Sequence, residues 1–176
     1  MRPAFFLPLA ALIFSSCAGY HVGPVKPTRM AKVSAIAVPD FKNDTLLPRV
    51  EVLLANALIK QFQQDGTYKI VRESDADAIL QGRLEQVIHT PARSVRGNVL
   101  LTREYTLTLR CLYEVTDRHT GALLDRQSAS GQTTFFATGS GNSAIASDIT
   151  QDQRQAFPLA AEQLAIDIVS RLSEGW

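Results

Sequence analysis

The stretch from residue 99 to 115 alternates apolar and polar side chains more regularly than any other part of the chain. One row is apolar apart from Arg103 and contains Val99, Leu101, Tyr105, Leu107, Leu109, Cys111, Tyr113 and Val115. The other row contains Thr102, Glu104, Thr106, Thr108, Arg110 and Glu114. Because successive side chains of a strand point to opposite faces, this pattern predicts a long antiparallel strand with one buried and one wet face. A fold that contains this strand must cover its apolar face only.

Two amphipathic helices are predicted, and they can provide that cover. The first spans about Pro48 to Gln64, starts with a proline in its first turn and ends before Gly66. Its inward face contains Val50, Leu53, Leu54, Ala57, Leu58, Gln61 and Phe62. The second spans about Asp148 to Leu172, and its apolar face contains Phe157, Ala160, Ala161, Leu164, Ile168 and Leu172. Pro158 is expected to kink or restart this helix, since proline has no amide N–H.

Four further strands complete the predicted sheet, at residues 33–38, 68–71, 78–90 and 122–136. The last of these is the most polar, which favours a place toward the sheet edge. Residues 40–45 are predicted to be a polar turn, 91–98 a hairpin loop and 137–147 a loop rich in Gly and Ser. The sequence therefore predicts an α+β two-layer sandwich. Its two helices pack on one face of a four- to five-stranded mixed or antiparallel sheet.

The N-terminal residues are typical of an export signal. An apolar run from Ala4 to Phe14 follows Arg2, and it is too short to span a bilayer, which needs about 20 residues. Ser15, Ser16 and Cys17 come next, and small residues before a cysteine resemble the lipobox of bacterial lipoproteins. That resemblance implies cleavage before Cys17, diacylglycerol on its thiol and an acylated (palmitate-type) N-terminus held in a membrane leaflet. The alternative is an ordinary cleaved signal peptide with an incidental cysteine.

The expected boundaries follow from this N-terminus. Residues 1–16 are the signal peptide, 17–32 the lipidated N-terminus with its linker, and 33–176 a single domain. Ala18 follows the cysteine. In proteobacterial lipoproteins an Asp at that position retains the protein in the inner membrane, so the resemblance implies the outer membrane, with the domain facing the periplasm.

Composition and motifs argue against several classes of function. The formal net charge is +1, so no bulk basic excess indicates nucleic acid. The three histidines have no metal-ligand spacing, and Gly139-Ser140-Gly141 lacks the Gly-x-Ser-x-Gly spacing of a nucleophile motif. We therefore expect neither an enzyme nor a cofactor apart from the lipid on Cys17. Cys111 lies in the apolar row of its strand, which predicts a buried, unreactive thiol.

Three stretches of the chain carry a family resemblance. They are CAGYHVG (Cys17 to Gly23), IAVPDFKNDTLLPRVEVLLANAL (Ile36 to Leu58) and DADAILQGRLEQV (Asp75 to Val87). Together they resemble the LPS-assembly lipoproteins of the LptE family, although Ala18 is an insertion relative to the family's opening. The resemblance implies an outer-membrane lipoprotein that plugs the LptD-type β-barrel of the LPS translocon, assists its assembly and helps lipopolysaccharide enter the outer membrane.

The same resemblance suggests where lipopolysaccharide is contacted. In the better-studied branch of the family, basic residues of the comparable region contact LPS phosphates. Here that region contains Arg93 and Arg96 in the predicted loop and Arg103 on the next strand. Guanidinium groups pair bidentately with phosphate, so these three residues are candidate LPS-phosphate contacts. The alternative is that they only keep a hairpin soluble.

A second resemblance implies a different function. A strand, the residues Pro39-Asp40-Phe41-Lys42-Asn43, a helix and then DADAILQG also resemble the N-terminal domains of TolB-like and CsgG-like periplasmic proteins. Penicillin-binding-protein activator lipoproteins share these features. Such relatives imply an accessory of secretion or of peptidoglycan synthesis. The opening CAGYH favours LPS assembly.

Overall fold

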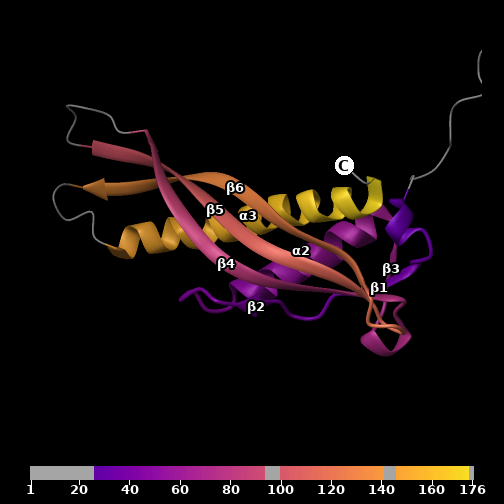
Figure 1. The fold of residues 1–176 in the computed structure, drawn as a ribbon. Helices are drawn as coiled ribbons and strands as arrows, with labels where there is room; N and C mark the ends of the chain where they lie inside the picture. The colour runs from indigo at the N-terminus through magenta and orange to yellow at the C-terminus, as the bar shows by residue number, and fades with distance from the viewer. Residues whose placement is uncertain (1–25, 94–99, 141–145, 175–176) are drawn as a thin grey trace, which may run out of the picture.

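The structure is a computed structural model, and it describes residues 26–93, 100–140 and 146–174. These residues form a six-stranded mixed sheet and two α-helices (Figure 1). The strands are β1 (Ala35–Ala37), β2 (Lys42–Asn43), β3 (Lys69–Ile70), β4 (Ala78–Arg93), β5 (Leu100–Asp117) and β6 (Leu123–Ser140). The helices are α2 (Val50–Asp65) and α3 (Ala146–Glu174), with 3-10 turns η1 (Thr28–Met30) and η2 (Glu73–Asp75). The predicted α+β sandwich is confirmed.

Three long antiparallel strands make up most of the sheet. The strand order is β3-β1-β4-β5-β6, and β2 pairs with β4 farther along the strand than β1 does. The short strands β1, β2 and β3 pair in parallel, whereas β4, β5 and β6 form an antiparallel meander. β6 is therefore an outer edge of the sheet, as its polar pattern predicted.

The long strands give the sheet two distinct ends. The near end holds β1 and β3, and the described chain begins there at Lys26 (Figure 1). The Lys26 ammonium lies 4.7 Å from the centroid of the Tyr68 ring and donates to the Val33 carbonyl at 2.8 Å, which fixes the entering chain. At the far end β4 and β6 stop, and β5 and α3 begin. A strand of 18 residues, such as β5, spans about 60 Å.

Both helices pack on the same face of the sheet (Figure 1), which is the face that receives the apolar row of β5. The row is fully buried and comprises Leu107, Leu109, Cys111, Tyr113 and Val115. Against it lie Leu54, Leu58 and Phe62 of α2 and Ala160, Ala161, Leu164, Ile168 and Leu172 of α3. The hydroxyl of Tyr113 has no hydrogen-bond partner among the described residues. Filling the core with this ring therefore carries a desolvation cost, about 1–3 kcal/mol for such a group.

Close backbone approach at Gly131 brings α3 against β6. A Cβ at this position would lie 2.1 Å from the Ala160 carbonyl oxygen and 2.4 Å from the Leu164 amide nitrogen. Both are backbone atoms of a packed helix, so neither can move aside easily. Gly82 in β4 makes similar room for the Phe41 ring, whose nearest atom would lie 1.9 Å from a Cβ there. The glycine in this strand therefore allows the close approach of the Phe41 ring.

Asp77 fastens β1 to the start of β4. Its carboxylate accepts the amide N–H groups of Ser34 and Ala35, each at 2.9 Å, and its own N–H donates to the Ala35 carbonyl at 3.0 Å. These two hydrogen bonds to the charged form lower the pKa of Asp77 below its usual value. Asp77 and Ala35 are 42 residues apart, so no local sequence pattern indicates this contact.

The structure corrects several predicted boundaries. Residues 42–43, predicted as part of a turn, form β2, which makes the sheet six-stranded. Residues 91–93 and 137–140 were predicted as loops and instead extend β4 and β6. Paired neighbours on both sides of β5 satisfy its backbone groups, which outweighs the Pro and Gly content of these stretches. In the predicted linker, η1 buries Met30 completely in the core.

Of the two outcomes predicted at Pro158, a kink or a restart of the second helix, the restart is wrong. α3 runs from Ala146 to Glu174 as one element with Pro158 inside it. Pro158 itself is exposed, whereas Phe157 and Ala160 beside it are buried. Packing on both sides of the proline therefore holds the helix together despite one missing backbone hydrogen bond.

Replacing Gly131 with alanine should destabilise the fold by about 1–3 kcal/mol, because the new methyl group would overlap the α3 backbone. Urea denaturation of the purified chain measures this change. Ser130→Ala, at the neighbouring exposed position, is the matched control and should change the free energy of unfolding by less than about 0.5 kcal/mol. Equal stability of the two variants would contradict the close approach of α3.

Replacing Asp77 with asparagine should lower stability by about 1 kcal/mol at pH 7, since charge-assisted bonds to two amides are weakened. The folded-state pKa of Asp77 lies below its unfolded value. Its contribution is therefore complete above the unfolded pKa, about 3.9, and is lost as pH falls through the folded pKa. The difference from wild type should shrink in unfolding curves measured below about pH 3. Asp40→Asn, at an exposed position, is the matched control and should change the free energy of unfolding at pH 7 by less than about 0.5 kcal/mol.

Candidate functional site

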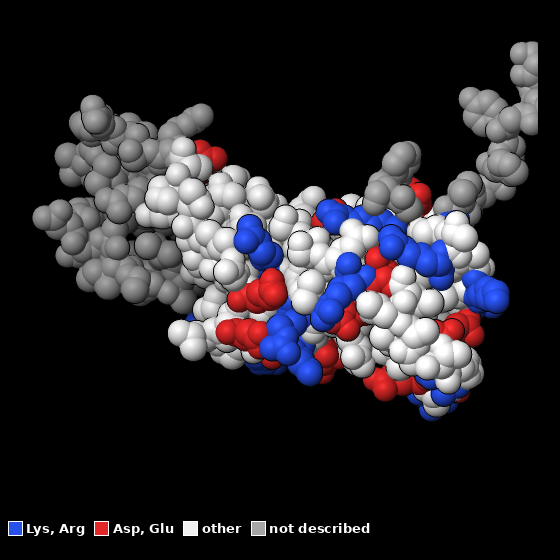
Figure 2. Space-filling view, viewed as in Figure 1, with Lys and Arg blue, Asp and Glu red and all other residues white. Residues whose placement is uncertain are grey.

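The candidate site lies on the face of the sheet that points away from the helices. Side chains that alternate with the buried rows project from this open face, and in the described residues no helix covers it (Figure 1). Figure 2 shows Lys and Arg side chains interleaved with Asp and Glu across its middle, with no extended patch of one sign. Such a surface suits contact with a polar partner.

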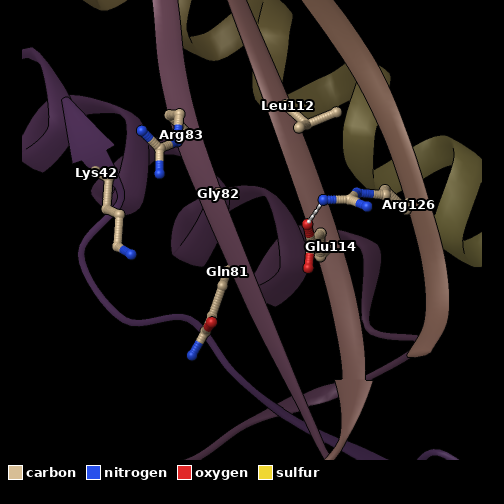
Figure 3. A pocket seen from close by; sticks show the side chains of 7 residues that line it. All are labelled: Lys42, Gln81, Gly82, Arg83, Leu112, Glu114 and Arg126. Carbon is tan, nitrogen blue, oxygen red and sulfur yellow. Dashed lines mark ion pairs between the residues drawn. The ribbon is translucent and has the colours of Figure 1, made fainter. Parts of the chain in front are cut away.

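A hollow of about 180 Å³ lies in the middle of this open face (Figure 3). Its floor is formed by β4 and β5, and its rim by β2 and β6. The lining residues are Lys42, Gln81, Gly82, Arg83, Leu112, Glu114 and Arg126. Parallel pairing of β2 with β4 puts Lys42 opposite Arg83, and the β5–β6 register puts Glu114 opposite Arg126. The hollow thus depends on β2, the strand that the sequence did not reveal.

Two of the three basic groups around the hollow are neutralised by local ion pairs. Arg83 donates from Nη1 to both carboxylate oxygens of Asp44, at 3.1 and 2.8 Å, and this pairing raises the pKa of Arg83. Arg126 pairs with Glu114 across the strands, as the dashed line in Figure 3 marks. In the described part of the chain, no hydrogen bond or ion pair engages the exposed ammonium group of Lys42. One positive charge therefore remains available to an anionic or polar group.

The arginines that the sequence singled out belong to the far end of the sheet. Arg93 is the last residue of β4 and pairs in register with Glu104, next to Arg103 on β5. The fold therefore brings Arg93 and Arg103 into neighbouring backbone positions. Arg96 and Cys17 lie outside the described residues. Arg93 is ten residues beyond Arg83 on β4, so the far end and the hollow are separated by about 30 Å.

Other reactive side chains do not converge on the open face. Cys111 is buried, and burial raises its pKa to about 12, so the prediction of a buried, unreactive thiol is confirmed. His89 packs edge-on against Phe135 with ring centroids 6.3 Å apart, and burial lowers its pKa. Among the described residues no group of three or more His, Cys, Asp or Glu side chains could hold a metal ion. The described residues of the open face therefore supply a polar surface for binding.

Sequence reasoning could reach only part of this site. Gln81 and Arg83 are exposed and alternate along β4 with the buried Leu80 and Leu84, a period that a sequence pattern can report. Lys42 and Asp44 were placed in a turn, since two paired residues in β2 leave no periodic signal.

None of the helices in the described residues is long and apolar enough to cross a membrane.

Comparison with known proteins defines the class to which this fold and surface belong. The model of a lipopolysaccharide-assembly family, LptE, matches residues 33–172. That range covers all six strands and α2, together with α3 to Leu172. The chain is thus a member of the LptE lipopolysaccharide-assembly family. A search of curated proteins found no match.

Solved structures share the fold at low sequence identity. A hypothetical protein from Chlamydia trachomatis is 10% identical with a TM-score of 0.53, and the alignment covers 80% of this chain and 95% of that one. A homologue of a neuraminyllactose-binding hemagglutinin from Helicobacter pylori is 13% identical with a TM-score of 0.51, covering 88% and 91%. A minor lipoprotein from Acinetobacter baumannii is 14% identical with a TM-score of 0.46, covering 80% and 92%.

Proposed function

We propose that this chain is a lipid-anchored outer-membrane protein that assembles lipopolysaccharide together with an LptD-type β-barrel. The observation that carries the proposal is the family match over residues 33–172. The elongated domain occupies the barrel from the periplasmic side and stabilises it through surface contacts. Its role is structural, and its chemistry is confined to binding polar and anionic groups.

The proposed anchor gives the domain an orientation. Cys17 is nine residues before Lys26, the first described residue, and nine residues reach at most about 30 Å. Acyl chains on Cys17 would therefore hold the near end close to the inner leaflet of the outer membrane. The far end, with Arg93 and Arg103, lies about 60 Å along the sheet. It is thus free to reach into a partner or toward a lipid in transit.

The far-end arginines are the proposed contacts for LPS phosphates. Arg93 and Arg103 occupy neighbouring backbone positions there. Arg96 belongs to the short stretch between β4 and β5. Several arginines close together in the sequence suit a ligand with more than one phosphate, because a guanidinium group can form a bidentate pair with a phosphate. Lys42 in the central hollow adds one unpaired charge for a polar contact with the partner.

Purification of the tagged chain from outer membranes in mild detergent tests this function. A β-barrel of the LptD type should be recovered in roughly equal amount, and labelled palmitate should be incorporated into wild type but not into Cys17→Ala. Recovery of a penicillin-binding protein or a secretion pore instead would favour the alternative family of envelope accessories. Palmitate incorporation into Cys17→Ala would contradict the proposed anchor.

Replacing Arg93, Arg96 and Arg103 together with alanine should weaken binding of purified lipopolysaccharide roughly tenfold or more, since several charge-assisted bonds are lost. Binding to lipopolysaccharide lacking its phosphates should change little between wild type and this variant. Arg72→Ala, at the near end with a side chain 88% exposed, is the matched control and should bind like wild type. Equal weakening by Arg72→Ala would show that only overall charge matters.

A further inference from the structure

β6 forms a long edge of the sheet, and the two halves of this edge differ in how far other described residues cover them. Among the described strands β6 pairs only with β5, so its other side is free along Leu123–Ser140. Natural proteins usually protect such edges with Lys, Pro or a covering segment. The sequence of β6 contains neither Lys nor Pro, and Arg126 is its only basic residue. Protection must therefore come from neighbouring elements.

The near half of the edge has such protection. Arg29 of η1 pairs with Asp125 at 3.1 Å. Arg171 of α3 donates to the Ser128 carbonyl and to Gln127, each at 3.2 Å. Because Arg171 reaches the Ser128 carbonyl from outside the sheet, that carbonyl points away from β5. Both side chains thus occupy the space where an added strand would lie.

Among the residues that the structure describes, none protects the far half in this way. Backbone groups alternate in direction along an antiparallel strand, so those of Ser130, Gln132 and Thr134 point outward like those of Ser128. No hydrogen bond from another described residue reaches them. In contrast to the near half, this stretch is therefore a ready template for strand pairing.

A groove runs beside this free half, between β6 and α3. One part, of about 480 Å³, is lined by Ser130, Gln132, Gln163, Ile166, Asp167, Ser170 and Arg171. A second part, of about 270 Å³, is lined by Thr134, Phe135, Phe136, Gln155, Ala156 and Leu159. Three apolar side chains of this region are unusually exposed, with Phe136 at 57%, Leu159 at 52% and Ile166 at 42%. The free backbone and the exposed apolar groups therefore coincide.

We infer that the far half of β6 accepts an extended strand from the barrel partner, an inference that rests on the proposed function. The added strand would pair with Ser130, Gln132 and Thr134. One row of its side chains would lie on Leu159 and Ile166 of α3, and the other row beside Phe136. No charged residue occurs in β6 after Arg126, and the two charged residues of the groove, Asp167 and Arg171, pair with each other at 2.9 Å. The groove therefore selects a neutral strand with apolar side chains at alternate positions.

The proposed anchor argues for this occupant over a second copy of the chain. Two copies joined edge to edge by a two-fold axis would run antiparallel, with their near ends pointing in opposite directions. Each near end must stay within about 30 Å of one membrane surface. Two such copies can both keep their near ends within this distance only if they lie flat on the membrane. A strand supplied by a partner at the far end places no such limit on the orientation of the chain.

Blocking the outward amide of Gln132 tests the inference. Gln132→Pro removes an N–H that makes no ladder bond within the sheet, so the melting temperature should stay close to that of wild type. Recovery of the barrel should fall roughly tenfold, because strand pairing is interrupted. Gln132→Ala keeps the N–H and should recover as much barrel as wild type. If Gln132→Pro lowers the melting temperature, Gln132→Lys serves as the second edge-blocking variant.

Photo-crosslinking distinguishes strand pairing from general contact. A benzoylphenylalanine placed in turn at residues 130, 132 and 134 should crosslink to one segment of the barrel, at positions that advance in steps of about two residues. Scattered crosslinks, dimers of the chain, or full barrel recovery with Gln132→Pro and Gln132→Lys would overturn the inference and leave the proposed function standing. If wild type itself recovers no barrel, the proposed function fails and this inference fails with it.

Discussion

Burial of one row of β5 side chains against two helices is the constraint on which the rest of the structure depends. With Leu107, Leu109 and Tyr113 turned toward α2 and α3, the intervening residues must face away from the helices. The open face, its hollow and its interleaved charges all result from this orientation of β5. The close approach of α3 at Gly131 completes it, because the long helix can then lie directly against β6 on that same face of the sheet.

The same arrangement divides the molecule along its length. At the near end, Lys26 packs on Tyr68 and Arg29 pairs with Asp125, so the chain that enters from the N-terminus is fixed to the core. At the far end the edge of β6 is bare, and the arginines proposed to contact phosphate occupy neighbouring backbone positions. With the anchor proposed at Cys17, the protein would be held at one end and open at the other, which suits work on a partner or lipid that lies away from the anchor.

The fold was largely predictable because its main signals are periodic. Alternation in β5 and helical spacing in α2 and α3 report which faces are buried. These predictions hold for most positions, but Leu53, predicted on the apolar face of α2, is 37% exposed, and Tyr105 of β5 is only partly buried. What failed was local: β2 is two residues long, and η1 buries Met30 from a stretch that resembles a linker. The hollow escaped prediction because it joins Lys42 to Arg83 through parallel pairing. Which half of the β6 edge stays free depends on the contacts that Arg29 and Arg171 make with its other half. These contacts join residues far apart in the sequence, so no local pattern predicts them.

The central claim is that this chain serves the delivery of lipopolysaccharide to the cell surface. The most direct measurement is the fraction of newly made, pulse-labelled lipopolysaccharide that becomes surface-exposed after the chain is depleted from its host. The account predicts that surface exposure falls while lipopolysaccharide accumulates inside the envelope, and that wild type restores it. Unchanged surface delivery, accompanied by a defect in peptidoglycan synthesis or protein secretion, would contradict the account.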